Sequence, residues 1–242
     1  MRLSGVDGGG LRNAIPREAV AHVAVPLAKV AKTRREVRHF AELVNKEFKG
    51  VEDEIIFVAE PAIKPRKVMT AAAQKRLVNA VCGCPNGVYS MSMSMPGLVQ
   101  TSSNLARVVS DDRKTRVQCL LRSSVNSEKE LLAGMISSVF ELAGARVKLS
   151  GGYDGWNPNM ESPILKTMTA AYEKLYGKKP EVMGVHAGLE CGIFGGAYPE
   201  MDMISFGPTI RYPHSPDEKV EVASVGKFWD FLCHTLENAP KK

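Results

Sequence analysis

The sequence lacks any run of apolar residues that could cross a membrane. A spanning helix needs about 20 consecutive apolar residues, and the longest apolar runs here fall far short of that length. The first residues, MRLSGVDGGGLRNAIP, have no apolar segment after a basic start, which a secretory signal requires. These absences predict a soluble, cytoplasmic protein without a membrane partner.

Cysteine is scarce, and its spacing is not that of a structural framework. The five residues are odd in number and fit neither paired disulfides nor a zinc finger. We therefore expect reduced thiols, as is usual in the cytoplasm. The cysteines are Cys82, Cys84, Cys119, Cys191 and Cys233.

A concentrated basic stripe is also missing. The net charge of +6 would suit an anionic partner such as nucleic acid. However, lysine and arginine alternate with acidic residues, as in KTRREVRHFAELVNKEFKG and SDDRKTR, without interleaved aromatics. The pattern is typical of solvated helix faces and argues against a nucleic-acid partner.

What is present is an ordinary globular composition, with 44% hydrophobic and 24% charged residues. The first 150 residues or so alternate strand-like and helix-like patterns, and Ser127 and Glu130 form a capping box before one of the helices, which Gly144 ends. This region predicts an α+β domain, an antiparallel sheet with helices on one face. Strands are expected over 17–25, 53–60, 88–95, 98–110, 115–125 and 146–152, and helices over 33–49, 70–83 and 127–143.

A stretch rich in glycine, proline and asparagine, GGYDGWNPN at 151–159, is the best candidate for a domain boundary. Beyond it the pattern predicts an α/β half-unit, which at about 80 residues is small for a sheet covered on both faces. Helices are expected over 162–177 and 224–238, and strands over 181–186 and 202–207.

His214 is the first candidate for chemistry. It follows a predicted strand in the sequence YPHSPDE, where Pro213 and Pro216 restrict the backbone on both sides. A fixed imidazole suits a metal ligand or an acid-base group, and Asp217 or Glu218 could orient it. The stretch also fits a plain cap or turn with an incidental histidine, and both interpretations stay open on this pattern.

The second candidate is GVHAGLECGIFGG at 184–196, whose glycines would let backbone approach a ligand closely. Cys191 with His186 and Glu190 suggests a thiol nucleophile and a base, but this spacing gives no triad geometry. A flexible loop is the alternative.

Two further residues have weaker signals. Asn13 lies in GGGLRNAIPRE, and Arg122 ends a predicted strand, where it would bind a carboxylate through two parallel hydrogen bonds or lie in water at a sheet edge. A catalytic zinc needs three or more protein ligands, yet H-x-D, H-E-x-x-H and Glu-Glu are all missing from the sequence. No complete metal site is evident.

Six stretches together resemble the aminoacyl-histidine dipeptidases, also called Xaa-His or cytosol non-specific dipeptidases, and the resemblance covers essentially the whole chain. They are GGGLRNAIPREA, SSNLARV, GWNPNMESPIL, VHAGLECGIF, ISFGPTI and PHSPDEKVEVASVGKFWDFL. The resemblance implies a zinc exopeptidase with two metal ions, in which a lid domain that often dimerises interrupts an α/β catalytic domain. By this resemblance, residues 1–152 would be a partial lid and 153–242 the C-terminal part of the catalytic domain.

The same resemblance implies roles for single residues. His214 would be the terminal zinc ligand, and Glu190 and His186 would line the substrate cleft. Asn13 and Arg122 would contact the dipeptide substrate.

The departure from the family concerns its metal site. Relatives carry an H-x-D motif, a bridging aspartate, a Glu-Glu pair that supplies the general base, and a further carboxylate, none of which occurs here. The resemblance therefore implies a C-terminal fragment, inactive alone, which would pair with a missing N-terminal half or form a homodimer. In intact relatives two zinc ions would activate the attacking water. The alternative is a non-enzymatic dimerisation or interaction module left from a truncated or split gene.

Overall fold

A computed structural model describes residues 1–52, 54–184, 190–213 and 217–239. Two compact units are present, and neither is one continuous stretch of chain. The first unit consists of Met1–Gly87, Ser103–Leu121 and Leu132–Lys148, and the second of Val88–Ser102, Arg122–Leu131 and Leu149–Lys242. The predicted domains, 1–152 and 153–242, stay predictions.

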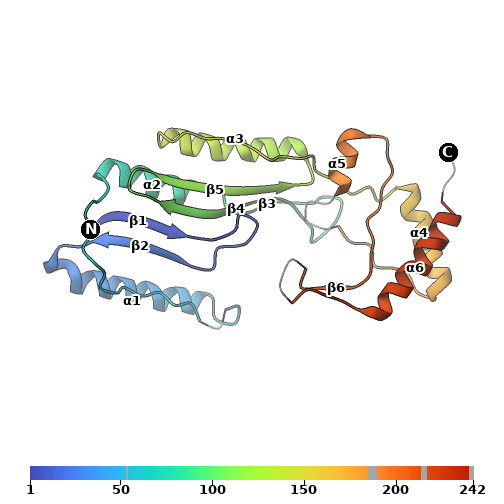
Figure 1. The fold of residues 1–242 in the computed structure, drawn as a ribbon, viewed down its shortest axis with the longest axis horizontal. Coiled ribbons are helices and arrows are strands. Elements are labelled where there is room, and N and C mark those ends of the chain that lie inside the picture. Colours follow the sequence, from blue (N-terminus) through green and yellow to red (C-terminus); the bar gives the residue numbers. More distant parts are fainter. Residues whose placement is uncertain (53, 185–189, 214–216, 240–242) are drawn as a thin grey trace. The chain divides into compact units, whose positions relative to one another are not determined.

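The main sheet has five strands (Figure 1). They are β1 (Arg2–Gly8), β2 (Ala19–Ala24), β3 (Gly87–Met91), β4 (Val99–Ser110) and β5 (Thr115–Ser123). The order is β2-β1-β4-β3, with β5 also paired to β4, and β1 runs antiparallel to β2 and β4. A separate antiparallel pair joins β6 (Ile210–Arg211) and β7 (Lys219–Val220). The predicted antiparallel sheet is thus confirmed.

Five helices agree well with the predicted ranges, whereas η1 and α5 were not predicted. They are the 3-10 helix η1 (Leu27–Lys29) and the α-helices α1 (Val30–Glu47), α2 (Ala71–Gly83), α3 (Asn126–Leu142), α4 (Pro163–Tyr176), α5 (Glu190–Ala197) and α6 (Val222–Glu237). Over the part of the chain that the structure describes, no helix is long and apolar enough to cross a membrane.

The core of the first unit lies between helices α2 and α3 and strands β4 and β5. Leu132 is fully buried there, and every second residue of β5 faces the same core, as the pleat of a strand requires. The buried members are Ala80, Cys84, Leu132, Ile136 and Phe140, and the half-buried residues packed against them include Leu105, Val117, Cys119 and Leu121. This packing places α2 and α3 on one face of the sheet.

Helix α1 has no buried residue. The segment after it packs on the helix through Phe57, whose ring centroid lies 5.3 Å from that of Phe40. Asn45 accepts a hydrogen bond from the Ile55 N–H (2.9 Å) and donates one to the Ile55 carbonyl (2.8 Å). The strand predicted over 53–60 is therefore wrong for residues 54–60, because side-chain partners replace strand pairing.

Other predicted strands are also missing from the described residues. Residues 146–150, 181–184 and 202–206 have no regular secondary structure. Strand β3 ends at Met91, because the Ser92 hydroxyl accepts a hydrogen bond from the Met95 N–H (3.2 Å) and favours a turn. Apolar alternation alone does not supply a neighbouring strand, and two of these segments contribute Val147 and Ile204 to the cores without one.

The prediction of a capping box at Ser127 and Glu130 is also wrong. Ser127 and Glu130 lie within α3, which begins at Asn126. Strand β1 was not predicted, because Gly5 and Gly8 weaken its strand signal. The predicted helix stop at Gly144 is confirmed, since this residue has a positive φ of 77° just after α3.

The core of the second unit forms where α4 and α6 pack together. Ser162 caps α4 by accepting a hydrogen bond from the Leu165 N–H (3.1 Å), and Gly177 ends the helix with φ 67°. The Phe231 ring lies edge-on to Tyr172, at 5.3 Å between centroids, and close to Phe206, at 5.4 Å. These aromatic contacts join the two helices to the 202–206 segment.

Candidate functional site

A polar clamp fixes the segment that follows residue 152. Asn126, the first residue of α3, donates a hydrogen bond to the Asp154 carboxylate (2.9 Å) and accepts one from the Gly155 N–H (2.9 Å). Lys129 donates to the Asn126 side-chain oxygen (3.1 Å) and to the Tyr153 carbonyl. The clamp thus orders a stretch of three residues that the sequence pattern assigned to a domain boundary.

Helix α5 lies directly on this stretch. A Cβ atom at Gly192 would lie 2.3 Å from the Asp154 carbonyl oxygen, and one at Gly196 would lie 2.4 Å from the Asp154 carboxylate. The two glycines are four residues apart and therefore share one face of the helix. At Gly192 the missing side chain lets backbone contact backbone, and at Gly196 it makes room for the Asp154 side chain.

The same stretch also contacts the end of β5. A Cβ atom at Gly155 would lie 2.5 Å from the backbone carbon of Ser124. Residues 154 and 155 therefore contact both the end of β5 and α5, and all three segments belong to the second unit. The flexible loop, one of the interpretations of 184–196, is wrong for residues 190–196, which form a helix. Glycines at positions i and i+4 were the signal of a closely packed helix.

Glu190 is exposed and is the first residue of α5. A carboxylate at this end of a helix is favoured by the helix dipole. Burial raises the pKa of the neighbouring Cys191 thiol above its ordinary value of 9.0. A nucleophilic thiol needs a lowered pKa. The raised pKa of Cys191 therefore argues against its acting as a nucleophile.

The remaining predicted site residues divide into three groups. Arg122 is half-buried near the end of β5, in the same unit as Glu190. Asn13 is exposed in the first unit, in a loop that Asn104 holds through hydrogen bonds to the Arg12 carbonyl (3.1 Å) and the Ala14 carbonyl (2.8 Å). His186 and His214 lie outside the described residues. The structure therefore brings Arg122 and Glu190 into one unit.

A second polar network surrounds Glu128 on α3. Ser90 donates a hydrogen bond to its carboxylate (2.6 Å), and the fully buried Thr101 donates another. Hydrogen bonds from Gln100, Ser90 and Thr101 lower the pKa of Glu128 below its ordinary value of 4.5. The network joins α3 to β3 and β4 inside the second unit, next to the clamp.

We expect Glu128→Gln to reduce stability at neutral pH by about 1 kcal/mol, the size of a typical hydrogen-bond loss. The pKa of Glu128 is lower in the folded than in the unfolded chain, so its ionised form stabilises the fold above pH 4.5. This contribution disappears as the pH falls through the lowered pKa. Chemical denaturation of both proteins between about pH 3 and 7 measures it.

Glu130→Gln is the matched control, because Glu130 is exposed on the same helix. It should keep the pH dependence of the parent protein. Acid profiles that are the same for the parent and Glu128→Gln would contradict a stabilising role for the ionised carboxylate.

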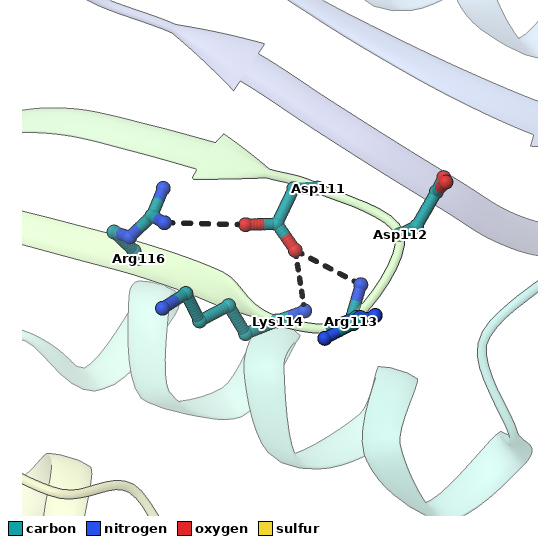
Figure 2. Close-up of a pocket in the computed structure, with 5 residues that line it drawn as sticks. All are labelled: Asp111, Asp112, Arg113, Lys114 and Arg116. Atoms are coloured by element: carbon teal, nitrogen blue, oxygen red, sulfur yellow. Dashed lines mark hydrogen bonds and ion pairs between the residues drawn. The ribbon is translucent and has the colours of Figure 1, made fainter.

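A shallow depression of about 540 Å³ lies over the turn between β4 and β5. Figure 2 shows Asp111 at its centre, accepting hydrogen bonds from the N–H groups of Arg113 and Lys114 (both 2.9 Å) and facing the Arg116 guanidinium at 3.3 Å. The two backbone hydrogen bonds lower the pKa of Asp111 below 3.8. Since no predicted site residue lines the depression, we assign these charges to stabilising the turn.

Comparison with known proteins identifies the family. Residues 13–238 match the model of peptidase family M20/M25/M40. The chain belongs to this family. Its sequence is 38% identical, over all 242 residues, to the cytosol non-specific dipeptidase of Escherichia coli (strain K12), of which it covers 50%. This identity confirms the resemblance drawn from the sequence.

Solved structures of similar proteins agree with the fold. The aminoacylhistidine dipeptidase from Vibrio alginolyticus is 44% identical and superposes with a TM-score of 0.90 over 100% of this chain and 49% of that one. The aminopeptidase PepT from Bacillus cereus is 17% identical, with a TM-score of 0.58 over 69% of this chain and 45% of that one, a likeness of fold alone. The chain thus spans about half the length of the dipeptidases that it matches.

Peptidases of the M20/M25/M40 family depend on metal ions. Within the described ranges, no three residues among His, Cys, Asp and Glu form a group that could hold one. A catalytic zinc takes three protein ligands and one open position. The described residues therefore do not fit a complete catalytic metal site.

Proposed function

We propose that this chain is part of a zinc-dependent dipeptidase that hydrolyses Xaa-His and other dipeptides. The observation that carries the proposal is the TM-score of 0.90 and 44% identity to an aminoacylhistidine dipeptidase over the whole chain. The described residues lack a metal-binding group, and the chain spans half the length of its relatives. We therefore propose that it is inactive alone and that the other ligands belong to sequence that this chain does not span.

In this proposal His214 supplies one zinc ligand, and His186 and Glu190 line the substrate cleft. Arg122 and Asn13 contact the substrate, because a guanidinium pairs with a carboxylate through two parallel hydrogen bonds and an amide both donates and accepts. The clamp at Asn126 and the glycine face of α5 fix the backbone that carries Glu190. A site held this rigidly keeps substrate groups in productive positions.

The partners and the compartment belong to the same proposal. We place the protein in the cytoplasm, in line with the name of the Escherichia coli relative. We also propose a homodimer, which light scattering of the purified chain tests. A strictly monomeric chain would contradict the homodimer and leave the peptidase proposal in place.

A complementation assay tests the function. The purified chain is incubated with zinc and a Xaa-His dipeptide, alone or co-expressed with the part of the Escherichia coli relative that it does not match. We expect no turnover by the chain alone and zinc-dependent hydrolysis by the complemented protein. His214→Ala should abolish that hydrolysis, and Arg122→Ala should raise KM because it removes a carboxylate partner.

Two controls match these variants. His39→Ala changes an exposed histidine on α1, and Arg107→Ala changes an exposed arginine on β4, and both should leave turnover unchanged. Zinc-dependent turnover by the chain alone would refute the incomplete metal site. A folded, complemented protein that binds zinc without hydrolysing any dipeptide would refute the peptidase proposal.

A further inference from the structure

Two thiols meet in the core of the first unit. The Sγ atoms of Cys84 and Cys119 lie 3.9 Å apart, although the residues are 35 positions apart in the sequence. Cys84 directly follows α2, and Cys119 lies in the middle of β5. Cys84 is buried at 7% exposure, and Cys119 is half-buried. Both side chains pack in the same apolar cluster as Leu132 and Phe140.

All five cysteines lie in described parts of the chain and are free thiols, as the sequence predicted. Cys84 and Cys119 differ from the others because each has a second thiol as a neighbour. A disulfide bond has an S–S length of roughly 2.05 Å and tolerates little backbone distortion. Starting from 3.9 Å, the two sulfurs must approach by about 2 Å to form the bond.

We propose that Cys84 and Cys119 form a reversible redox pair that a peroxide oxidises to an intramolecular disulfide. This inference does not depend on the proposed peptidase function, because both residues lie in the first unit and neither belongs to the candidate site. The pair would be a modification site on the scaffold formed by α2 and β5.

The two thiols have different parts in the reaction. The hydrogen bond between the two thiols lowers the pKa of Cys84 and, together with burial, raises the pKa of Cys119. Cys84 is therefore the better source of a thiolate, and the thiolate is the species that attacks a peroxide. Cys119 keeps its proton and acts as the resolving thiol.

Each step of the oxidation balances. The Cys84 sulfur attacks one peroxide oxygen and breaks the O–O bond, which gives a sulfenic acid and a hydroxide that leaves as water with the thiol proton. The Cys119 sulfur then attacks the Cys84 sulfur, so the S–S bond forms and the S–O bond breaks. The second hydroxide takes the Cys119 proton and leaves as water. In total, two thiols and one hydrogen peroxide give one disulfide and two waters.

Mass spectrometry of the purified chain after treatment with dilute hydrogen peroxide tests the proposal. We expect a mass loss of about 2 Da, for two hydrogen atoms, and a fall in titratable thiols from five to three, since the disulfide uses two. Digestion without reductant should give one cross-linked peptide pair that contains Cys84 and Cys119. Dithiothreitol should restore the original mass and all five thiols.

Single substitutions of the cysteines test which thiol reacts with peroxide and which one closes the disulfide. In Cys119→Ser the resolving thiol is gone, so the sulfenic acid on Cys84 should persist and react with dimedone. In Cys84→Ser no disulfide should form. Cys82→Ser is the matched control, because Cys82 is exposed and only two positions from Cys84. In this variant the disulfide between Cys84 and Cys119 should form at the parental rate. Circular dichroism of each variant verifies folding.

Two results would overturn the proposal. One is a disulfide that joins Cys82 to another cysteine or to a second chain. The other is oxidation of the parent to a stable sulfenic or sulfinic acid while both core thiols stay free. If Cys84→Ser fails to fold, the dimedone result with Cys119→Ser and the peptide map of the parent still decide between these outcomes.

Discussion

Replacing Leu132 with alanine is expected to lower the free energy of unfolding by about 2–5 kcal/mol. Leu132 is 0% exposed and lies at the centre of the cluster formed by α2, α3 and the sheet. Truncation to alanine removes buried methyl groups and leaves a cavity, since packed neighbours relax only in part. Urea denaturation of both proteins, followed by circular dichroism, measures the difference.

Leu131→Ala is the control for this change. Leu131 precedes Leu132 on the same helix but is 55% exposed, so its truncation should alter the free energy of unfolding by no more than about 0.5 kcal/mol. Helix propensity falls equally in the two variants, because leucine is replaced by alanine in both. Equal effects at the two positions would contradict the assignment of the core to the Leu132 face.

Replacing Gly192 with alanine is expected to separate α5 from the 154–155 stretch. The new Cβ would lie 2.3 Å from the Asp154 carbonyl oxygen, a backbone atom in the stretch that Asn126 holds through two hydrogen bonds. Overpacking of this kind costs about 1–3 kcal/mol. Under the proposed function, kcat/KM of the complemented enzyme should fall by about 100-fold, as for a displacement of about 1 Å in a positioned group.

Gly195→Ala tests the same helix without the clash. Its Cβ would meet the Met203 Cε atom at 3.3 Å, and the end of a methionine side chain can move aside. Since alanine is the better helix former, this variant should be neutral or more stable by up to about 1 kcal/mol. Hydrogen exchange measures how well the amides of α5 are protected in Gly192→Ala and in Gly195→Ala. Equal protection in the two variants would refute the close packing at Gly192.

Local signals in the sequence predicted most helices and several strands. Ser162 and Gly177 mark the ends of α4 in the sequence as they do in the structure, because caps act through neighbouring backbone atoms. A strand forms only where a neighbouring strand pairs with it, and the local sequence pattern does not show which segment that neighbour is. The apolar segment at 54–60 therefore has the composition of a strand, yet Asn45 binds its backbone instead.

The candidate site was only partly predictable. Polar and charged residues at 190 and 122 stood out because their chemistry is visible in the sequence. The contact of Asp154 with Gly192 and Gly196 was not visible, because it depends on a close approach of distant segments that missing side chains permit. The clamp at Asn126 joins residues 28 positions apart, a separation at which sequence patterns contain no pairing information.

The interleaving of the two units has a consequence for dissecting the protein. No single cleavage or truncation point leaves both units whole, since the chain returns to the first unit twice before Leu149. A protease cut after Lys148 would keep the first unit intact but would remove 88–102 and 122–131 from the second. The C-terminal piece would then lose Asn126, the partner of Asp154, together with the segments that surround Glu128. Limited proteolysis should therefore yield a stable N-terminal product and a C-terminal product that unfolds.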